Sequence, residues 1–170
     1  MKKKYLIFIL SLITLNADCI KEIKRLTFEE YLINFNKVLK NKDKKFKLNR
    51  INLEGNLFKY KADNEIYNKS DYWANPKEFF LNKGGDCEDY VIFKYYLLKK
   101  YNIGEDYKFV YESMNGVNHL YLLVKLNGEY YRLDNNYRKP KKVLNIKNIN
   151  KKEPFFLLKK KVNYKENFFS

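Results

Sequence analysis

The sequence is poor in the residues that break or disorder a polypeptide chain. Its 170 residues include only six glycines and three prolines, whereas hydrophobic residues make up 45% and aromatic residues 18%. This composition excludes a largely disordered chain and indicates a compact globular fold. The sequence also lacks internal repeats and any interdomain linker, so its length suits one domain with a buried core.

Three chemically distinctive residue types are rare in this chain. It has two cysteines, Cys19 and Cys87, one histidine, His119, and one tryptophan, Trp73. Cys19 lies close to the N-terminus, where a permanent disulfide with Cys87 is not expected. Cys87 is therefore interpreted as a free thiol in the middle of the sequence.

Acidic residues are outnumbered, with 20 Asp and Glu against 35 Lys and Arg and a formal net charge of +15. A charge of this size can indicate a nucleic acid or an anionic membrane as the partner. The lysines, however, are scattered among asparagines and tyrosines, and this favours a solvated basic surface without a nucleic-acid role. A non-catalytic basic binding module remains the alternative from another class.

Beyond the N-terminus no apolar run is a candidate membrane span. The run from Tyr5 to Leu15 is short for a span, follows three lysines and precedes Ala17, which is the layout of a secretory signal peptide. We therefore expect a signal peptide at residues 1–17, export of the protein, and a single domain at residues 18–170. An uncleaved anchor and a lipid on Cys19 are the alternatives.

Helical periodicity dominates the first two thirds of the chain. The predicted segments are a helix over 27–40 with Thr27 as its N-cap, a polar stretch over 41–47, a weaker helical pattern over 48–61 broken by Gly55, a short helix opened by Pro76 and stopped by glycine, and a helix from Asp86 to about Tyr101. The last of these contains "YVIFKYYLL", which is apolar on most sides, so we expect it to be the buried central helix.

After Gly104 the pattern changes to aromatic and β-branched runs separated by turn residues. These runs predict strands over 107–114, 118–126, 129–134 and 154–164. Helices followed by an antiparallel sheet are typical of the α+β class.

The dipeptide Asn127-Gly128 predicts a two-residue type I′ hairpin turn. In that register paired positions sum to 255, so that His119 faces Asn136 and Tyr121 faces Asp134. His119 and Asp134 then project from the same face as diagonal neighbours, within reach of a hydrogen bond. A slip of one residue would put them on opposite faces, and an ordinary strand histidine is the alternative.

Cys87 lies in "GGDCEDY", at the predicted start of the central helix, with Asp86 as a natural N-cap and Asp89 placed to complete a capping box. A helix N-terminus and a nearby imidazolium both lower a thiol pKa. A buried structural thiol is the alternative. A helix start with Cys87 opposite a sheet with His119 and Asp134 favours nucleophilic acyl transfer.

The segments "DYWANPKEFFLNKGGDCEDYVIFKYYLLKKYNI", "NHLYLLV" and "YYRLDN" closely resemble the bacterial transglutaminase-like cysteine proteinases, the LapG-like periplasmic proteases. The resemblance spans roughly residues 47–136. It implies a papain/transglutaminase-like α+β core, with the nucleophile at the start of a buried helix packed on an antiparallel sheet. It also implies that Cys87 is the nucleophile, His119 the general base and Asp134 the residue that orients the histidine.

The same resemblance implies calcium dependence, with Asp86, Glu88 and Asp89 as the ligands, and clustered carboxylates suit such a hard cation. The alternative is that these acids only favour the positive end of the helix. Family members of this type act in the periplasm on large surface adhesins, in the context of biofilms, and a membrane receptor for cyclic di-GMP sequesters them. We expect a monomer with a protein substrate and no nucleic-acid partner.

The expected reaction is cleavage of a peptide bond through a thioester on Cys87, with the Cys87 backbone N–H as the first oxyanion donor. Trp73 is expected to pack beside the site as a substrate neighbour, with ordinary core packing as the alternative. A transglutaminase or an amidase with the same three residues is the alternative reaction.

Overall fold

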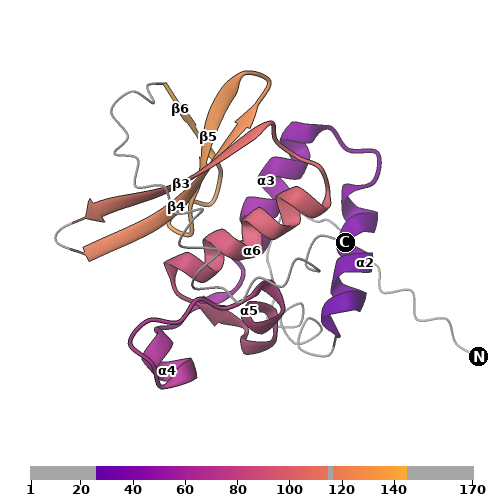
Figure 1. Cartoon of the computed structure of the whole chain (residues 1–170). Helices are drawn as coiled ribbons and strands as arrows, with labels where there is room; N and C mark the ends of the chain where they lie inside the picture. Colours follow the sequence, from indigo (N-terminus) through magenta and orange to yellow (C-terminus); the bar gives the residue numbers. More distant parts are fainter. Residues whose placement is uncertain (1–25, 115–116, 145–170) are drawn as a thin grey trace, which may run out of the picture. The chain divides into compact units, whose positions relative to one another are not determined.

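The structure is a computed structural model that describes residues 26–114 and 117–144 (Figure 1). The chain forms two units, Met1–Asn41 and Lys42–Ser170. The predicted signal peptide, Cys19 and the predicted strand at 154–164 lie outside the described residues. No helix within the described ranges is long and apolar enough to cross a membrane.

The described part of the first unit is the helix α2 (Phe28–Leu39). Thr27 caps it as predicted: its hydroxyl accepts from the Glu30 N–H, and the Glu30 carboxylate accepts from the Thr27 N–H, which completes a capping box. The predicted apolar stripe is buried, at Phe28, Tyr31, Leu32, Phe35 and Leu39.

The second unit begins with α3 (Lys44–Gly55), which corrects two predictions. The polar stretch over 41–47 is partly helical, because the Asp43 carboxylate accepts from the Phe46 N–H at 2.7 Å and so starts the helix early. The helical pattern over 48–61 is wrong beyond Gly55, because residues Lys59–Tyr60 form the strand β1. The short helix α4 (Asp63–Tyr67) follows and was not predicted.

The next helix, α5 (Pro76–Asn82), begins as predicted, with Pro76 in its first turn and Asn75 as its N-cap. It does not end at a glycine: Lys83 takes the left-handed conformation with φ 58°. Gly84–Gly85 instead form β2, which pairs in parallel with β1. A Cβ on Gly84 would lie 2.0 Å from the Lys59 carbonyl oxygen, so the glycine permits this close approach of two backbones.

The helix α6 (Cys87–Lys100) is the buried central helix, as predicted. All but three of its residues are buried, and it packs against α3, α5 and β4. Aromatic rings fill the junction with α5, where the centroids of Phe79 and Phe93 are 5.0 Å apart. A helix buried on every side holds its first residue, Cys87, in a fixed position.

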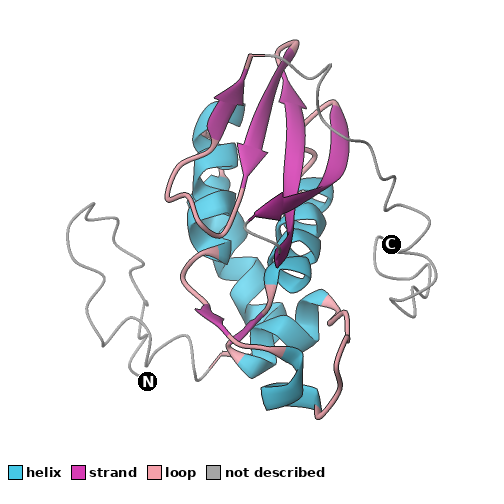
Figure 2. Cartoon of the chain, turned by 90° about the vertical axis from the view of Figure 1, so that its left-hand side faces the viewer, coloured by secondary structure: helices cyan, strands magenta, loops and turns pink. Residues whose placement is uncertain are grey.

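Four antiparallel strands form one sheet in the order β3 (Asp106–Met114), β4 (Val117–Leu126), β5 (Glu129–Leu133), β6 (Lys141–Val143) (Figure 2). Leu126 pairs with Glu129 and Leu122 with Leu133, which confirms the predicted register. Both turn residues have positive φ, 53° at Asn127 and 80° at Gly128, as a type I′ turn requires. The strand β6 was not predicted. Helices followed by an antiparallel sheet confirm the α+β class.

Candidate active site

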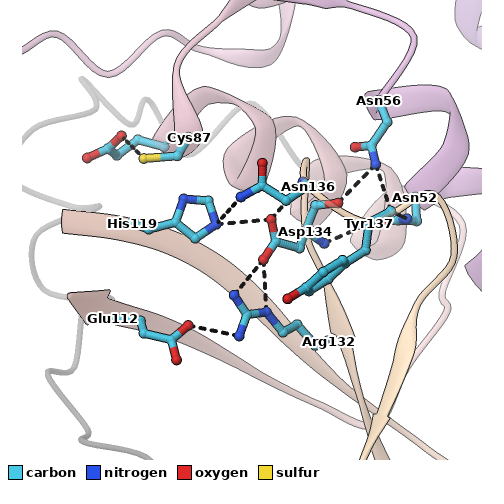
Figure 3. A network of polar contacts seen from close by, with 10 residues as sticks. Asn52, Asn56, Cys87, Glu112, His119, Arg132, Asp134, Asn136 and Tyr137 are labelled. Atoms are coloured by element: carbon cyan, nitrogen blue, oxygen red, sulfur yellow. Dashed lines mark hydrogen bonds and ion pairs between the residues drawn. The ribbon is translucent and has the colours of Figure 1, made fainter. Parts of the chain in front are cut away.

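His119 and Asp134 meet at one end of the β4–β5 hairpin, as the register predicts. His119 lies on β4, Asp134 follows the last residue of β5, and His119 Nε2 is 3.0 Å from Asp134 Oδ1. Both side chains are buried, and Asp134 is only 1% exposed. The predicted diagonal contact is therefore confirmed as a hydrogen bond (Figure 3).

The Asp134 carboxylate is surrounded by hydrogen-bond donors. Oδ1 also accepts from the Asn136 N–H at 2.9 Å, and Oδ2 accepts from Arg132 Nε at 2.8 Å. Burial alone would raise the pKa of Asp134, but the hydrogen bonds from His119, Asn136 and Arg132 lower it to about 2. Asn52 of α3 and its C-cap residue Asn56 secure the backbone, because Asn52 Oδ1 accepts from the Asp134 N–H and Asn56 Nδ2 donates to the Asp134 carbonyl.

An ionised Asp134 fixes the tautomer of His119. A carboxylate only accepts hydrogen bonds, so Nε2 must carry the proton that points to Asp134 Oδ1. The other ring nitrogen, Nδ1, is then an acceptor in the neutral imidazole. This is the protonation pattern that a general base requires.

Cys87 lies on the other side of the imidazole from Asp134 (Figure 3). The thiol is 8% exposed and contacts the backbone N–H of Leu120, the residue that follows His119 on β4. The first turn of α6 therefore brings the only cysteine of the described ranges next to the only histidine of the sequence.

The thiol does not have the lowered pKa that its place at a helix start predicts. Burial and the adjacent carboxylate of Glu88 raise the pKa of Cys87 far above its usual range, and the Leu120 N–H offsets only part of this effect. Cys87 Sγ donates to Glu88 Oε2 at 2.8 Å. In this arrangement the thiol is protonated, and its hydrogen bond goes to Glu88.

A cluster of three aspartates lies beside the thiol. Asp63 of α4, Asp86 and Asp89 each offer a carboxylate oxygen, and these oxygens lie within 4.8 Å of one another. Asp86 occupies the N-cap position of α6, but its side chain makes no capping hydrogen bond, so the predicted capping role is wrong. Its carboxylate belongs to the cluster instead. Glu88 is not part of this cluster.

The chemistry of this aspartate cluster fits a hard divalent cation. Burial, together with the charges of Glu88 and Asp89, raises the pKa of Asp86 to about 9, and burial raises the pKa of Asp89 to about 7. Asp86 Oδ1 and Asp89 Oδ2 are buried and have no hydrogen-bond partner among the described residues. Buried oxygens without donors are the ligands that calcium takes.

Gly85 explains part of the "GGDCEDY" motif. A Cβ at this position would lie 2.1 Å from Asp89 Oδ2, so only glycine leaves room for the aspartate. The other oxygen, Asp89 Oδ1, accepts from the Ala74 N–H at 2.7 Å. Trp73, the residue before Ala74, is buried in the core at 5% exposure. Its predicted contact with a substrate stays a prediction.

Several residues of the site were missed in the sequence. Arg132 could have been found, because residues two apart on a strand share a face and it precedes Asp134 by two. Glu112 could also have been found, since it pairs with His119 in the β3–β4 register. Asn52, Asn56 and Asp63 come from segments far from His119 and Asp134 in the sequence, and no local pattern marks them.

Comparison with known proteins agrees with this geometry. Residues 29–162 match the family described as bacterial transglutaminase-like cysteine proteinase. Among solved structures, Legionella pneumophila LapG aligns with 27% identity and a TM-score of 0.56, covering 73% of this chain and 75% of that chain. The calcium-bound form of that protein aligns with 28% identity and the same TM-score, covering 73% and 76%. Its EGTA-treated form aligns with 27% identity and a TM-score of 0.56, covering 73% of this chain and 74% of that chain. No curated protein matches the chain. The chain therefore belongs to the bacterial transglutaminase-like cysteine proteinases.

Proposed function

We propose that this protein is a cysteine endopeptidase in which Cys87 is the nucleophile, His119 the general base and acid, and Asp134 the residue that orients His119. The observation that carries the proposal is the His119–Asp134 hydrogen bond of 3.0 Å beside a thiol at a helix start. The family of the chain makes peptide-bond cleavage the reaction class that this geometry supports best.

The reaction begins with transfer of the Cys87 proton to His119 Nδ1, while Asp134 holds the opposite nitrogen. The thiolate attacks the carbonyl carbon of the peptide bond, and the Cys87 N–H at the start of α6 donates to the oxyanion. His119 then protonates the departing amine, which leaves a thioester on Cys87. Water, deprotonated by His119, releases the acid and restores the thiol.

The proposal includes a calcium ion held by Asp63, Asp86 and Asp89. When bound, the ion supplies positive charge that offsets the carboxylates next to the thiol. Glu88 was predicted as a ligand from the family resemblance, whereas its carboxylate here accepts the hydrogen bond from the thiol. Asp63, which no local pattern marked, takes the third place in the cluster.

The substrate and the location in this proposal rest on the sequence. The signal-peptide layout of residues 1–17 supports export to the periplasm. The family resemblance supports a large surface adhesin as the substrate and a membrane receptor for cyclic di-GMP as a regulator.

Cleavage of an adhesin segment by the purified protein tests the proposal. We expect new peptide ends, found by mass spectrometry, that disappear with Cys87→Ala and with His119→Ala. Cys19→Ala is the matched control, because it removes the other cysteine of the sequence, and it should cleave at the wild-type rate. Cleavage that survives Cys87→Ala would contradict the proposal.

The same reactions with an added primary amine identify the acyl acceptor. A protease gives a new carboxylate end in both cases. A product that carries the amine in place of the carboxylate would assign a transglutaminase instead.

A further inference from the structure

We propose that Arg132 is a positioning residue of this site, which acts on His119 through Asp134 and is itself held in place by Glu112. The inference rests on the proposed function and deepens it. It assigns a role to two residues that lie outside the Cys87–His119–Asp134 set.

Arg132 contacts one oxygen of the Asp134 carboxylate and leaves the other for His119. Its Nε and Nη2 lie 2.8 Å and 2.7 Å from Asp134 Oδ2, whereas Oδ1 contacts His119 Nε2 at 3.0 Å. A carboxylate bound at both oxygens cannot rotate without breaking charge-assisted hydrogen bonds. The guanidinium therefore fixes the direction in which Asp134 presents Oδ1 to the imidazole.

Arg132, on β5, is itself held by side chains of the adjacent strand β4 and of the next strand, β3. Its Nη1 lies 2.8 Å from Glu112 Oε2 on β3, and its guanidinium carbon lies 3.6 Å from the centre of the Tyr121 ring on β4. The side chain is 14% exposed. The guanidinium is fixed in place because it stacks on the Tyr121 ring and contacts the carboxylates of Asp134 and Glu112.

The network closes on itself. Glu112 pairs with His119 in the β3–β4 register, so a path runs from His119 through Asp134 and Arg132 to Glu112 and back to the strand of His119 (Figure 3). Arg132 also places a positive charge next to a carboxylate that is fully buried. Without the guanidinium, Asp134 would lose both contacts at Oδ2, and its carboxylate would be free to rotate away from His119.

A planar fork is needed for this task. Two nitrogens of one guanidinium reach Oδ2 while the third reaches Glu112, and an ammonium offers a single point from which to donate. We therefore expect Arg132→Lys to retain charge but only part of the orientation. Arg132→Met should lose both, while it keeps an unbranched apolar side chain at this position.

Proton NMR of the only histidine tests the proposal without any substrate. In protein labelled with ¹⁵N-histidine, the Nε2–H proton of wild type should give one downfield, slowly exchanging signal, because it is buried and bonded to a carboxylate. We expect Arg132→Met to lose this signal, Arg132→Lys to weaken it and Glu112→Gln to affect it least. On a cleaved substrate, kcat of Arg132→Met should fall by about tenfold or more with KM unchanged.

Arg50→Met is the matched control. Arg50 also pairs with a buried carboxylate, Glu54, at 2.9 Å, but on α3 and outside the network. The Arg50→Met variant should have a lower melting temperature and an unchanged His119 signal. An unchanged His119 signal in folded Arg132→Met would overturn the proposal. If the wild-type protein cleaves nothing, the proposed function fails, while the NMR signal still decides the role of Arg132.

Discussion

The site contains Asp134 beside His119 and a cluster of Asp63, Asp86 and Asp89 beside Cys87, and the surroundings of these carboxylates are opposite in kind. Asp134 is surrounded by donors, and the hydrogen bonds from His119, Asn136 and Arg132 lower its pKa to about 2 against the effect of burial. Asp86 and Asp89 face each other and Asp63, and burial raises their pKa values to about 9 and about 7. Asp134 is compensated at both oxygens within the chain, whereas the cluster is compensated only in part, because Asp86 Oδ1 and Asp89 Oδ2 have no donor among the described residues.

This difference separates what the fold supplies from what must be added. The Asp134 group has its counter-charge, its tautomer and its geometry without any further component. The aspartate cluster has buried oxygens without hydrogen-bond donors. Their negative charge is offset only when a proton or a cation binds to them. The base side of the site is therefore preformed, and the nucleophile side depends on what binds next to it.

The largest expected effect comes from Asp134→Asn. An amide can accept from His119 only in one orientation and carries no charge, so the imidazole loses its fixed tautomer and the stabilisation of its charged form. Cleavage should fall by roughly 10²- to 10⁴-fold. The free energy of unfolding should also fall by about 3 kcal/mol, because Arg132 loses a buried partner. Wild-type turnover in this variant would contradict the compensated role of Asp134.

Calcium should raise the melting temperature of the wild-type protein. At a concentration of 100 times the dissociation constant, the stabilisation is about 2.7 kcal/mol, or about 5 to 10 °C. Thermal unfolding with calcium and with EGTA measures it. Asp63→Asn should abolish the shift, whereas Asp71→Asn, the same change at an exposed residue outside the cluster, should keep it. An equal shift in both variants would exclude the aspartate cluster as the site.

Lys94 extends the comparison into the core of α6. It is fully buried, its Nζ has no hydrogen-bond partner among the described residues, and its Cε lies 2.7 Å from where a Cβ on Gly55 would be. Burial lowers its pKa from 10.5 to about 7, although the charge of Asp134 opposes this. Between about pH 7 and pH 10.5, Lys94 is protonated in the unfolded chain and neutral in the folded chain.

Stability attributable to Lys94 should therefore rise with pH from about 7 to about 10, by up to about 1.4 kcal/mol per pH unit. Lys94→Met should remove this slope and be more stable than wild type near pH 7, as measured by urea unfolding across the range. Lys99→Met, an exposed position on the same helix, is the control and should keep the slope. Parallel curves for wild type and Lys94→Met would refute the assignment.

The smallest expected effect is a change in stability whose sign differs between the aspartate cluster and Asp134. In the absence of calcium, Asp86→Asn should raise the free energy of unfolding by about 1 kcal/mol, since it removes one of three converging acids. Asp134→Asn should do the opposite. Denaturant unfolding in EGTA measures the sign of the change in unfolding free energy for each variant. A destabilised Asp86→Asn variant would show that the cluster is compensated after all.

The compensated half of the site could be predicted from sequence because local rules govern it. Asn127-Gly128 fixes the turn, the turn fixes the register, and the alternation of strand side chains then puts His119 and Asp134 on one face. The N-terminal helix Phe28–Leu39 and the central helix Cys87–Lys100 follow equally local signals, caps and apolar periodicity.

The aspartate cluster could be predicted only in part, with Asp86 and Asp89 from the family resemblance, because the place of Asp63 in it depends on tertiary contacts. Asp86 occupies the N-cap position of α6 without a capping hydrogen bond. Its carboxylate lies instead in the cluster with Asp63 of α4, and this contact between distant segments has no local signal. Lys83 ends α5 in a conformation that glycine usually takes, because the two glycines after it are needed against β1 and Asp89. Local propensity does not show which of several suitable residues the fold will use.

The most direct test of the account is the rate at which iodoacetamide alkylates Cys87 near neutral pH in the presence of calcium. Peptide mass spectrometry follows Cys87 and, as a reference in the same chain, Cys19. We expect Cys87 of the wild-type protein to react with iodoacetamide at least about 100-fold faster than Cys87 of His119→Ala, because His119 takes the thiol proton. Equal Cys87 rates in the two proteins would contradict it.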